Sequence, residues 1–174
     1  MKKIHIIAIA AFAAICGSGA QAQSQIAMAN GYYGELGYSQ VKVSGAGGTA
    51  KPDAVRFLVG SELNANMGLE AMYTTTASKD QRVGYDAAVS HFGIFIKPKM
   101  TLTNNTEVFA RVGAVRADIT AAAGPSHKGN DLAYGLGIQT KFTQSLYGQL
   151  DYMNAYDRSG VMAKGFTVSL GARF

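Results

Sequence analysis

The sequence predicts an all-β fold, an eight-stranded antiparallel up-and-down transmembrane β-barrel that occupies residues 31–174. Apolar and polar residues alternate from residue 31 onwards, which is typical of strands whose two faces meet different surroundings. The charged residues fall almost entirely in one phase of this alternation. Short and long links also alternate along the chain, as they do in a barrel with tight turns at one end and loops at the other.

The segment before the predicted barrel has the features of an export signal. Met1-Lys2-Lys3 is positively charged, residues 4–15 are mostly apolar, and Ala20-Gln21-Ala22 has the small-x-small pattern of a signal peptidase site. The apolar run is shorter than the roughly 20 residues that a membrane-spanning helix needs. We therefore expect residues 1–22 to be a cleaved signal peptide and residues 23–30 to be a short periplasmic segment.

The mature chain carries little that suggests a metal, a cofactor or a nucleic acid. Cys16 lies within the predicted signal peptide, so no disulfide is expected to hold the fold. Loss of Lys2 and Lys3 lowers the Lys and Arg count from 16 to 14 against 11 acidic residues, a net charge of +3. These basic residues are spread singly, which does not indicate nucleic-acid binding. Two histidines without cysteine make no metal-ligand cluster, so no metal or cofactor is expected.

Eight alternating segments are expected to be strands. They are residues 31–43, 55–63, 67–76, 87–100, 106–119, 132–142, 145–154 and 162–174. The links "LNANMG" (63–68), "LTNNT" (102–106) and "FTQS" (142–145) contain Asn, Thr and Gln, as tight turns do. The links over residues 44–53, 77–84, 121–129 and 155–160 are longer and rich in glycine and charge. We expect the turns in the periplasm and the loops outside the cell.

Each expected strand separates an apolar face from a polar face. In chain order the apolar face holds Tyr32, Leu36, Tyr38; Val55, Phe57, Val59, Leu63; Leu69, Ala71, Tyr73; Phe92, Ile94, Ile96; Val108, Ala110, Val112; Leu132, Tyr134, Leu136, Ile138; Leu146, Leu150, Tyr152; and Phe166, Val168, Leu170, Ala172, Phe174. The opposite face holds the charges, His91 and the glycines at 37, 60, 68, 93, 113, 135, 137 and 171.

This separation favours a membrane barrel over a soluble one. A soluble barrel or sandwich turns its apolar face inward and its charges to water. A Lys or Arg that faces lipid at the bilayer centre costs roughly 2–4 kcal/mol, so in a membrane barrel the charges must face the lumen. A lipocalin-like carrier is the soluble alternative and needs an apolar pocket. Here the chargeless face is a continuous band with aromatic residues towards its ends, as in interfacial girdles.

We expect the lumen to be plugged by paired charges. The interior of an eight-stranded barrel is just wide enough to be filled by side chains, and buried charges are tolerated when they are paired and hydrogen-bonded. The expected lumen network consists of Glu35, Arg56, Glu62, Glu70, Lys97, Lys99, Glu107, Arg111, Gln139, Gln149 and Asp151, with Lys141 and Arg173 on the same face.

Several segments resemble the small outer-membrane β-barrel family typified by the OmpA transmembrane domain and OmpX. They are "GYYGELGYSQ" (31–40), "GSELNANMGLEAMY" (60–73), "TLTNNTEVFARVGAVRAD" (101–118), "GIQTKFTQSLYGQLDY" (137–152) and the terminal "LGARF". The resemblance implies that the barrel-assembly machinery recognises Phe174 and that periplasmic chaperones escort the chain. It also implies a lumen network that includes Glu70, Lys97 and Arg111. Where the family has a Glu and an Arg, this sequence has Gln139 and Gln149, which keeps the interior charge balanced.

Some small barrels are enzymes that modify lipid A, and the deacylases among them share a residue pattern. A deacylase pattern needs His and Ser two residues apart, but His127 is followed by Lys128 and Gly129. Ser90 and His91 are neighbours and would point to opposite faces of a strand. No catalytic residue is therefore expected; His91 is expected in the lumen and His127 in a loop.

The sequence thus predicts a monomeric integral outer-membrane barrel with a structural or surface-interaction role. A small ion or solute channel is the alternative, and a lipid A-modifying enzyme is less favoured. The expected partners are outer-membrane lipids and lipopolysaccharide. Candidate contacts for its phosphates, which basic side chains attract, are Lys51, Lys79, Arg82, Lys128 and Arg158.

Overall fold

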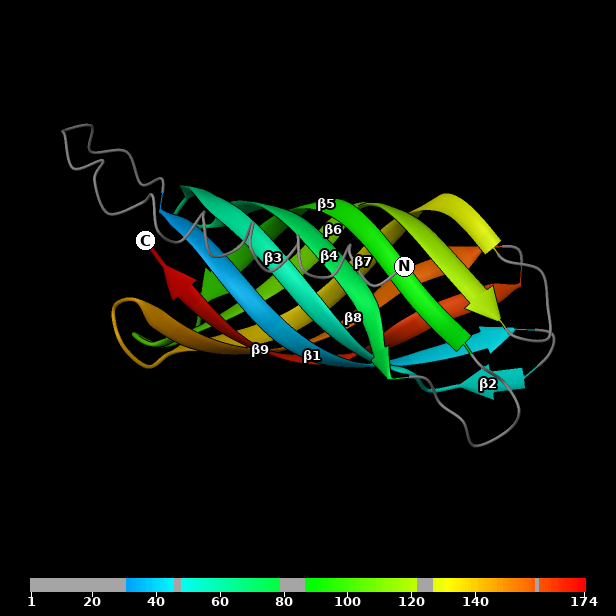
Figure 1. The fold of residues 1–174 in the computed structure, drawn as a ribbon. Coiled ribbons are helices and arrows are strands. Elements are labelled where there is room, and N and C mark those ends of the chain that lie inside the picture. The colour runs from blue at the N-terminus through cyan, green and yellow to red at the C-terminus, as the bar shows by residue number, and fades with distance from the viewer. Residues whose placement is uncertain (1–30, 46–47, 79–86, 122–126, 159) are drawn as a thin grey trace.

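The computed structural model describes residues 31–45, 48–78, 87–121, 127–158 and 160–174 (Figure 1). The predicted signal peptide and periplasmic segment lie outside these residues. The described residues form nine strands, namely β1 (Tyr32–Gly45), β2 (Gly48–Ala50), β3 (Asp53–Asn64), β4 (Met67–Ser78), β5 (Ala87–Thr101), β6 (Thr106–Ala121), β7 (His127–Lys141), β8 (Leu146–Arg158) and β9 (Val161–Arg173). No described segment is a helix long and apolar enough to span a membrane.

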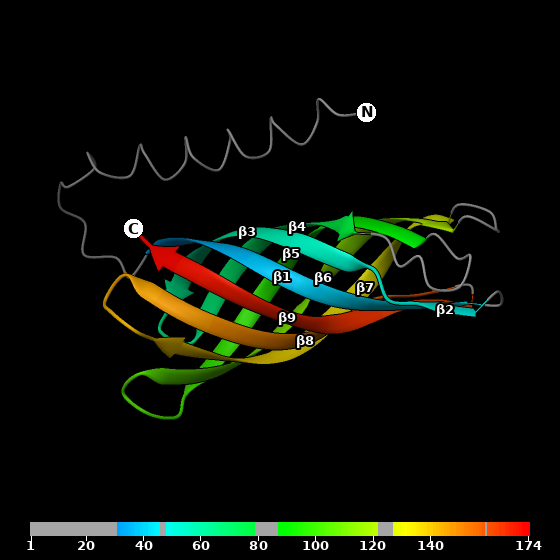
Figure 2. The same cartoon turned by 60° about the horizontal axis from the view of Figure 1, so that its bottom comes forward.

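The sheet closes on itself. From β3 to β9 each strand pairs antiparallel with the next, β1 pairs with β3, and β9 returns to pair with β1. The closing register runs from Tyr33↔Arg173 to Ser44↔Met162. Figures 1 and 2 show the tilted strands wrapped around one axis. In the described residues this is a closed antiparallel barrel of eight long strands, which confirms the predicted fold class.

The two ends of the barrel differ. The turn end carries the links β3–β4, β5–β6 and β7–β8 together with the C-terminus, and β2 lies at the opposite end, the loop end (Figure 1). The hydroxyl of Thr103 accepts the backbone N–H of Thr106 at 3.1 Å, and the hydroxyl of Thr143 accepts that of Leu146 at 2.9 Å. These local hydrogen bonds satisfy the turn backbone and explain why short links with threonine suffice.

The strands extend further at the loop end than the sequence predicts. β7 begins at His127 rather than 132, and β8 continues to Arg158 rather than 154. His127 therefore belongs to a strand and not to a loop. In the expected loop 44–53, β2 folds back on β1 with Val43↔Ala50 and Gly45↔Gly48 in register. Beyond the membrane both faces of a strand can meet water, so pairing continues where the alternation has ended.

The two faces of the barrel wall have opposite character. Large apolar side chains on the outward face are open, with Leu36 50%, Phe92 51%, Leu136 70% and Val168 62% exposed. Charged side chains on the inward face are closed off, with Glu35, Arg56 and Arg111 each 1% exposed. The outward band can face acyl chains because lipid, unlike water, imposes no cost on apolar surface.

Candidate functional site

The middle of the lumen holds a compact ionic cluster. Its members are Glu35, Glu70, Asp151, Arg56, Lys97 and Arg111, from six different strands, and each is at most 3% exposed. Three acids thus face three bases. This balance allows the charges to be buried, because each ion has partners of opposite sign.

Two arginines carry the cluster across the lumen. Arg56 on β3 donates to both carboxylate oxygens of Asp151 on β8, with Nη1 2.8 Å from Oδ2. Arg111 on β6 donates through Nε to Oε2 of Glu70. Its Nη1 lies 3.1 Å from Oδ1 of Asp151, and its Nη2 lies 3.4 Å from Oε2 of Glu35. These bonds join strands that are not neighbours in the sheet.

Lys97 and two glutamines complete the network. Lys97 Nζ lies 3.1 Å from Oε1 of Glu70 and donates to the amide oxygens of Gln139 at 3.1 Å and Gln149 at 3.2 Å. Nε2 of Gln149 donates to Glu35 at 3.0 Å and to Asp151 at 3.1 Å. An amide can thus serve a cation and an anion at once, which links the two signs without adding charge.

A second ionic group lies towards the turn end. Lys99 Nζ is 2.6 Å from Oε2 of Glu62, and Lys141 Nζ is 2.9 Å from Oε1 of Glu107. Arg173 Nη2 lies 3.7 Å from Glu62 and 3.6 Å from Glu107. The side chains of Lys141 and Arg173 are 32% and 25% exposed, so this group is more open to solvent than the central cluster.

Four aromatic rings inside the barrel were not predicted, and each lies directly opposite a glycine on the next strand. The pairs are Tyr33↔Gly60, Phe95↔Gly113, Phe109↔Gly137 and Tyr147↔Gly171. A Cβ at any of these glycines would collide with the facing ring. An aromatic residue in the charged phase, opposite a glycine in that same phase, is the sequence signal that could have identified them.

The rings also support the ionic cluster. The hydroxyl of Tyr33 donates to Glu70 at 2.9 Å, and that of Tyr147 donates to Glu35 at 2.9 Å. Lys97 Nζ lies 4.5 Å from the centroid of the Phe109 ring, and the guanidinium carbon of Arg111 lies 4.7 Å from it. The cluster is therefore enclosed by rings that hold its charges in place through hydrogen bonds and cation–π contacts.

The loop-end half of the lumen is apolar, which corrects the expectation of a polar interior throughout. The apolar plug is formed by Val41, Val43, Ala54, Val89, Ala117, Ile119, Tyr156, Val161 and Ala163, each at most 9% exposed. Inward positions change from charged to apolar along the strands at Ser39 and Thr167, whose hydroxyls lie 2.7 Å apart. The pattern of charged residues along the strands does not reveal this change, because the plug residues carry no charge.

A small cavity separates the ionic cluster from the apolar plug. It has a volume of about 20 Å³, and Arg56, Thr74, His91 and Thr167 contribute to its lining. Nε of Arg56, Oγ1 of Thr74 and both ring nitrogens of His91 are buried and have no hydrogen-bond partner among the described residues. A cavity of this size has room for about one water molecule.

Three of the five predicted lipopolysaccharide contacts lie in the described residues, all at the loop end. Lys128 lies in β7 and pairs with Asp118 at 2.8 Å. Arg158 ends β8 and donates to the backbone oxygen of Asn130 at 3.0 Å. Lys51 lies between β2 and β3, whereas residues 79 and 82 fall outside the described residues.

The remaining predicted positions lie where their strands place them. Phe174 is at the turn end, where its backbone N–H donates to the carbonyl of Tyr32 at 2.9 Å. His91 is buried inside and the neighbouring Ser90 is not in its phase. Within the described part of the chain, no three His, Cys, Asp or Glu side chains are placed to hold a metal ion.

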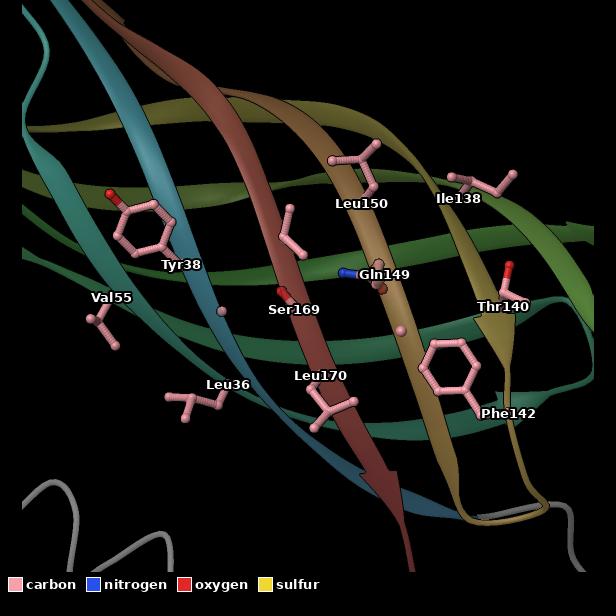
Figure 3. Close-up of a pocket in the computed structure, with 13 residues that line it drawn as sticks. Leu36, Tyr38, Val55, Ile138, Thr140, Phe142, Gln149, Leu150, Ser169 and Leu170 are labelled. Atoms are coloured by element: carbon pink, nitrogen blue, oxygen red, sulfur yellow. The ribbon is translucent and has the colours of Figure 1, made fainter.

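Among the described residues, the outward face has a broad apolar hollow of about 840 Å³ (Figure 3). It crosses β1, β3, β7, β8 and β9, and its lining includes Leu36, Tyr38, Leu150, Val168 and Leu170. Gly148 leaves the space that the Phe142 ring partly covers. Because this surface belongs to the lipid-facing band, we expect acyl chains to contact it.

Comparisons with known proteins agree with the fold. Among similar solved structures, Ail of Yersinia pestis, an attachment invasion locus protein, has 19% identity and a TM-score of 0.63 over 84% of this chain and 100% of that chain. Neisserial surface protein A has 16% identity and a TM-score of 0.65 over 82% and 97%. OprG of Pseudomonas aeruginosa has 11% identity and a TM-score of 0.56 over 84% and 96%. At these identities the likeness concerns the fold alone.

The comparison with curated protein sequences gives no match. A family model described as an outer membrane protein β-barrel domain matches residues 8–174. This match covers the whole described barrel and confirms the resemblance to small outer-membrane barrels. The chain therefore belongs to the outer membrane protein β-barrel domain family.

Proposed function

We propose that this outer-membrane protein is a closed barrel whose role in the envelope is structural or surface-interacting, and that it neither conducts solutes nor catalyses a reaction. The observation that supports this proposal is the filling of the lumen by two successive layers. The ionic cluster spans the middle, and the apolar plug fills the half towards the loop end.

The two layers oppose permeation for different reasons. An ion that enters the central cluster must replace charge-assisted hydrogen bonds, such as those of Arg111 with Glu70. Apart from the hydroxyl of Tyr156, the side chains of the apolar plug carry no polar group, and a hydrophobic constriction of this kind excludes water and ions. A rearrangement of salt bridges alone would therefore leave the second barrier in place.

Planar-bilayer recording tests the closed state. We expect no stable single-channel conductance from the purified barrel. We also expect none from variants in which smaller side chains replace residues of the apolar plug alone or of the ionic cluster alone. A stable conductance that is abolished by Arg111→Gln or Lys97→Gln would contradict the proposal and favour the small-channel alternative.

The proposed orientation places the loop end outside the cell and the turn end, with the C-terminus, in the periplasm. Cys16 is the single cysteine of the sequence and lies in the predicted signal peptide, so introduced cysteines can be labelled selectively. With a membrane-impermeant maleimide on intact cells, Thr49→Cys at the loop end should react and Asn104→Cys at the turn end should not. The reverse pattern would overturn the orientation.

The proposal that the protein is not an enzyme rests on the placement of its candidate residues. Ser90 and His91 lie in opposite phases of β5, so they do not form a nucleophile–base pair. Mass spectrometry of lipopolysaccharide after incubation with the purified barrel should show unchanged lipid A. A loss or gain of an acyl chain would contradict this and restore the lipid A-modifying alternative.

A further inference from the structure

Three inward polar side chains lie in one row across β3, β4 and β5. Arg56 is directly opposite Thr74, and Thr74 is directly opposite His91. Directly opposed residues on one face have Cβ atoms about 4.5–5.5 Å apart, so the three side chains meet the same part of the lumen. Each is at most 4% exposed, and all three line the cavity of about 20 Å³ between the ionic cluster and the apolar plug.

This row offers hydrogen-bonding groups that no described residue uses. The Nη atoms of Arg56 donate to Asp151 and Ser169, but its Nε is buried and has no partner. Oγ1 of Thr74 and both ring nitrogens of His91 are in the same condition. Buried polar groups without a partner are costly, so a ligand that completes their hydrogen bonds is favoured in this cavity.

The cavity presents more donors than a water molecule can satisfy. Ser39 and Thr167 also line it, and their hydroxyls lie 2.7 Å apart. Whichever hydroxyl accepts this bond keeps its own proton, which it can donate to the cavity. The Nε–H of Arg56 is a donor and never an acceptor. A water molecule accepts about two hydrogen bonds, whereas an anion accepts from every donor around it.

The size of the cavity limits the anion to a single atom. A volume of about 20 Å³ has room for about one water molecule. Phosphate, sulfate and carboxylates are larger than this space, whereas a chloride ion is close to a water molecule in size. The donors and the volume together therefore indicate a chloride site.

Charge balance couples the anion to a proton. The central cluster already has three acids and three bases, and an unbalanced charge among them would be strongly destabilising. A proton on His91 supplies the balancing charge and makes both ring nitrogens donors. Without that proton, His91 offers one donor and one acceptor, which suits a neutral water molecule.

The surroundings of His91 contain no carboxylate that could balance its proton within the cavity. Of the described residues that line the cavity, Arg56 on β3 and Lys164 on β9 carry charge, and Lys164 is at an outward position of its strand. Opposite His91, β6 contributes Ala117. On β8 the titratable Tyr156 belongs to the apolar plug. The other described lining residues are uncharged, namely Ser39, Val41, Thr74, Met153, Ala155, Gly165 and Thr167.

We propose that this cavity binds one chloride ion together with one proton on His91. Arg56 Nε, the Thr74 hydroxyl and the His91 ring donate to the ion, and a water molecule takes its place when His91 has no proton. Because one negative and one positive charge bind together, the net charge of the lumen does not change. The site depends neither on the orientation of the barrel nor on the absence of conductance.

The test follows the protonation of His91 by NMR. The purified barrel is refolded into zwitterionic detergent in sodium chloride or in sodium gluconate of equal ionic strength, so that a closed lumen does not keep the ion out. The mature chain has two histidines, His91 and His127, and the His127→Gln variant assigns their signals. Chloride at ten times its dissociation constant should raise the pH midpoint of His91 by about one unit and leave His127 unchanged.

Two valine variants test the row without altering His91. Thr74→Val keeps the size of the side chain but removes one donor, so chloride should move the His91 midpoint less than in the unchanged protein. Thr120→Val, at an exposed outward position, is the matched control and should retain the full movement. Sulfate in place of chloride should leave the midpoint where gluconate leaves it, because sulfate is too large for the cavity.

Three results would overturn the site. A His91 midpoint that is the same in chloride and gluconate would mean that the cavity holds water only. Equal movement of His91 and His127 would mean a general effect of the salt. A full movement in Thr74→Val, or an equal one in sulfate, would place the anion elsewhere. These outcomes concern the folded barrel in either salt, so they are distinct from the conductance that tests its closure.

Discussion

Arg111 on β6 forms an ion pair with Glu70 on β4, across the lumen and past the intervening strand β5. Both side chains are 1% exposed. The wall of the barrel is held by hydrogen bonds between neighbouring strands, but this pair connects strands that do not touch along their edges. The ion pairs of the lumen therefore add to the stability that the wall provides.

Glu70→Gln should destabilise the barrel strongly. It leaves Arg111 and Lys97 with less negative charge nearby, and removal of one partner from a buried ionic cluster typically costs about 3–5 kcal/mol. The measurement is the urea dependence of unfolding in lipid vesicles. Lys128→Gln, whose side chain is 65% exposed in its pair with Asp118, is the control and should cost less than about 1 kcal/mol. Equal losses for the two variants would contradict a central role for the cross-lumen cluster.

Gly171→Ala should lower stability because the added Cβ collides with the ring of Tyr147. Overpacking of this kind costs about 1–3 kcal/mol. Gly31→Ala is the matched control, since a Cβ there meets nothing within 4 Å, and it should be nearly neutral. The midpoint of thermal unfolding, followed by the gel mobility of folded and unfolded barrel, reports both. A neutral Gly171→Ala would show that the Tyr147 ring has another place to lie.

Thr74→Val tests whether the small cavity is hydrated. If one water molecule bridges Thr74, Arg56 and His91, the variant loses a hydrogen bond. The free energy of unfolding then falls by about 1 kcal/mol, and the unfolding midpoint falls with it. A dry cavity would give the opposite sign, because the variant then removes a buried hydroxyl without a partner. We expect the fall. Thr120→Val, at an exposed outward position, should change little and serves as the control.

Phe174→Ala should reduce the amount of barrel assembled in cells more than it reduces stability. The side chain is 38% exposed at the turn end, so its loss removes little packing. The family resemblance implies that the assembly machinery recognises this residue. Outer-membrane abundance in cells and refolding yield from urea into vesicles separate the two effects. A refolding defect as large as the cellular one would mean that Phe174 acts only as a packing residue.

The outward face could be predicted from the sequence because a charged side chain that faces lipid costs a large free energy. Leu136 and Val168 face lipid and are apolar. Lys97 and Arg111 face the lumen, because a charged side chain that faces lipid is strongly destabilising. The ends of the strands could not be predicted in this way. At Lys128 and Arg158 both faces can meet water, and the alternation that marks a strand in lipid disappears while the backbone pairing continues.

The contents of the lumen could be predicted only in part. Charge phase placed Glu70 and Arg111 on the inward face, but their pairing depends on the distance across the barrel, which the one-dimensional pattern does not contain. Tyr33 and Phe109 share the phase of the charges and become visible only when the register sets each against a glycine. Plug residues such as Val89 and Ile119 have the character of outward residues, so composition does not separate the two groups.

The closed lumen is the central claim, and the reaction of a buried cysteine tests it most directly. Ala133 on β7 faces the lumen and is 0% exposed, and Ala133→Cys adds a single sulfur atom. A small water-soluble thiosulfonate should react completely with the folded Thr49→Cys barrel while the cysteine of the folded Ala133→Cys barrel stays unmodified. In urea the cysteine of Ala133→Cys should become reactive. Modification of the folded Ala133→Cys barrel at a rate close to that of Thr49→Cys would show an open, hydrated lumen and contradict the account.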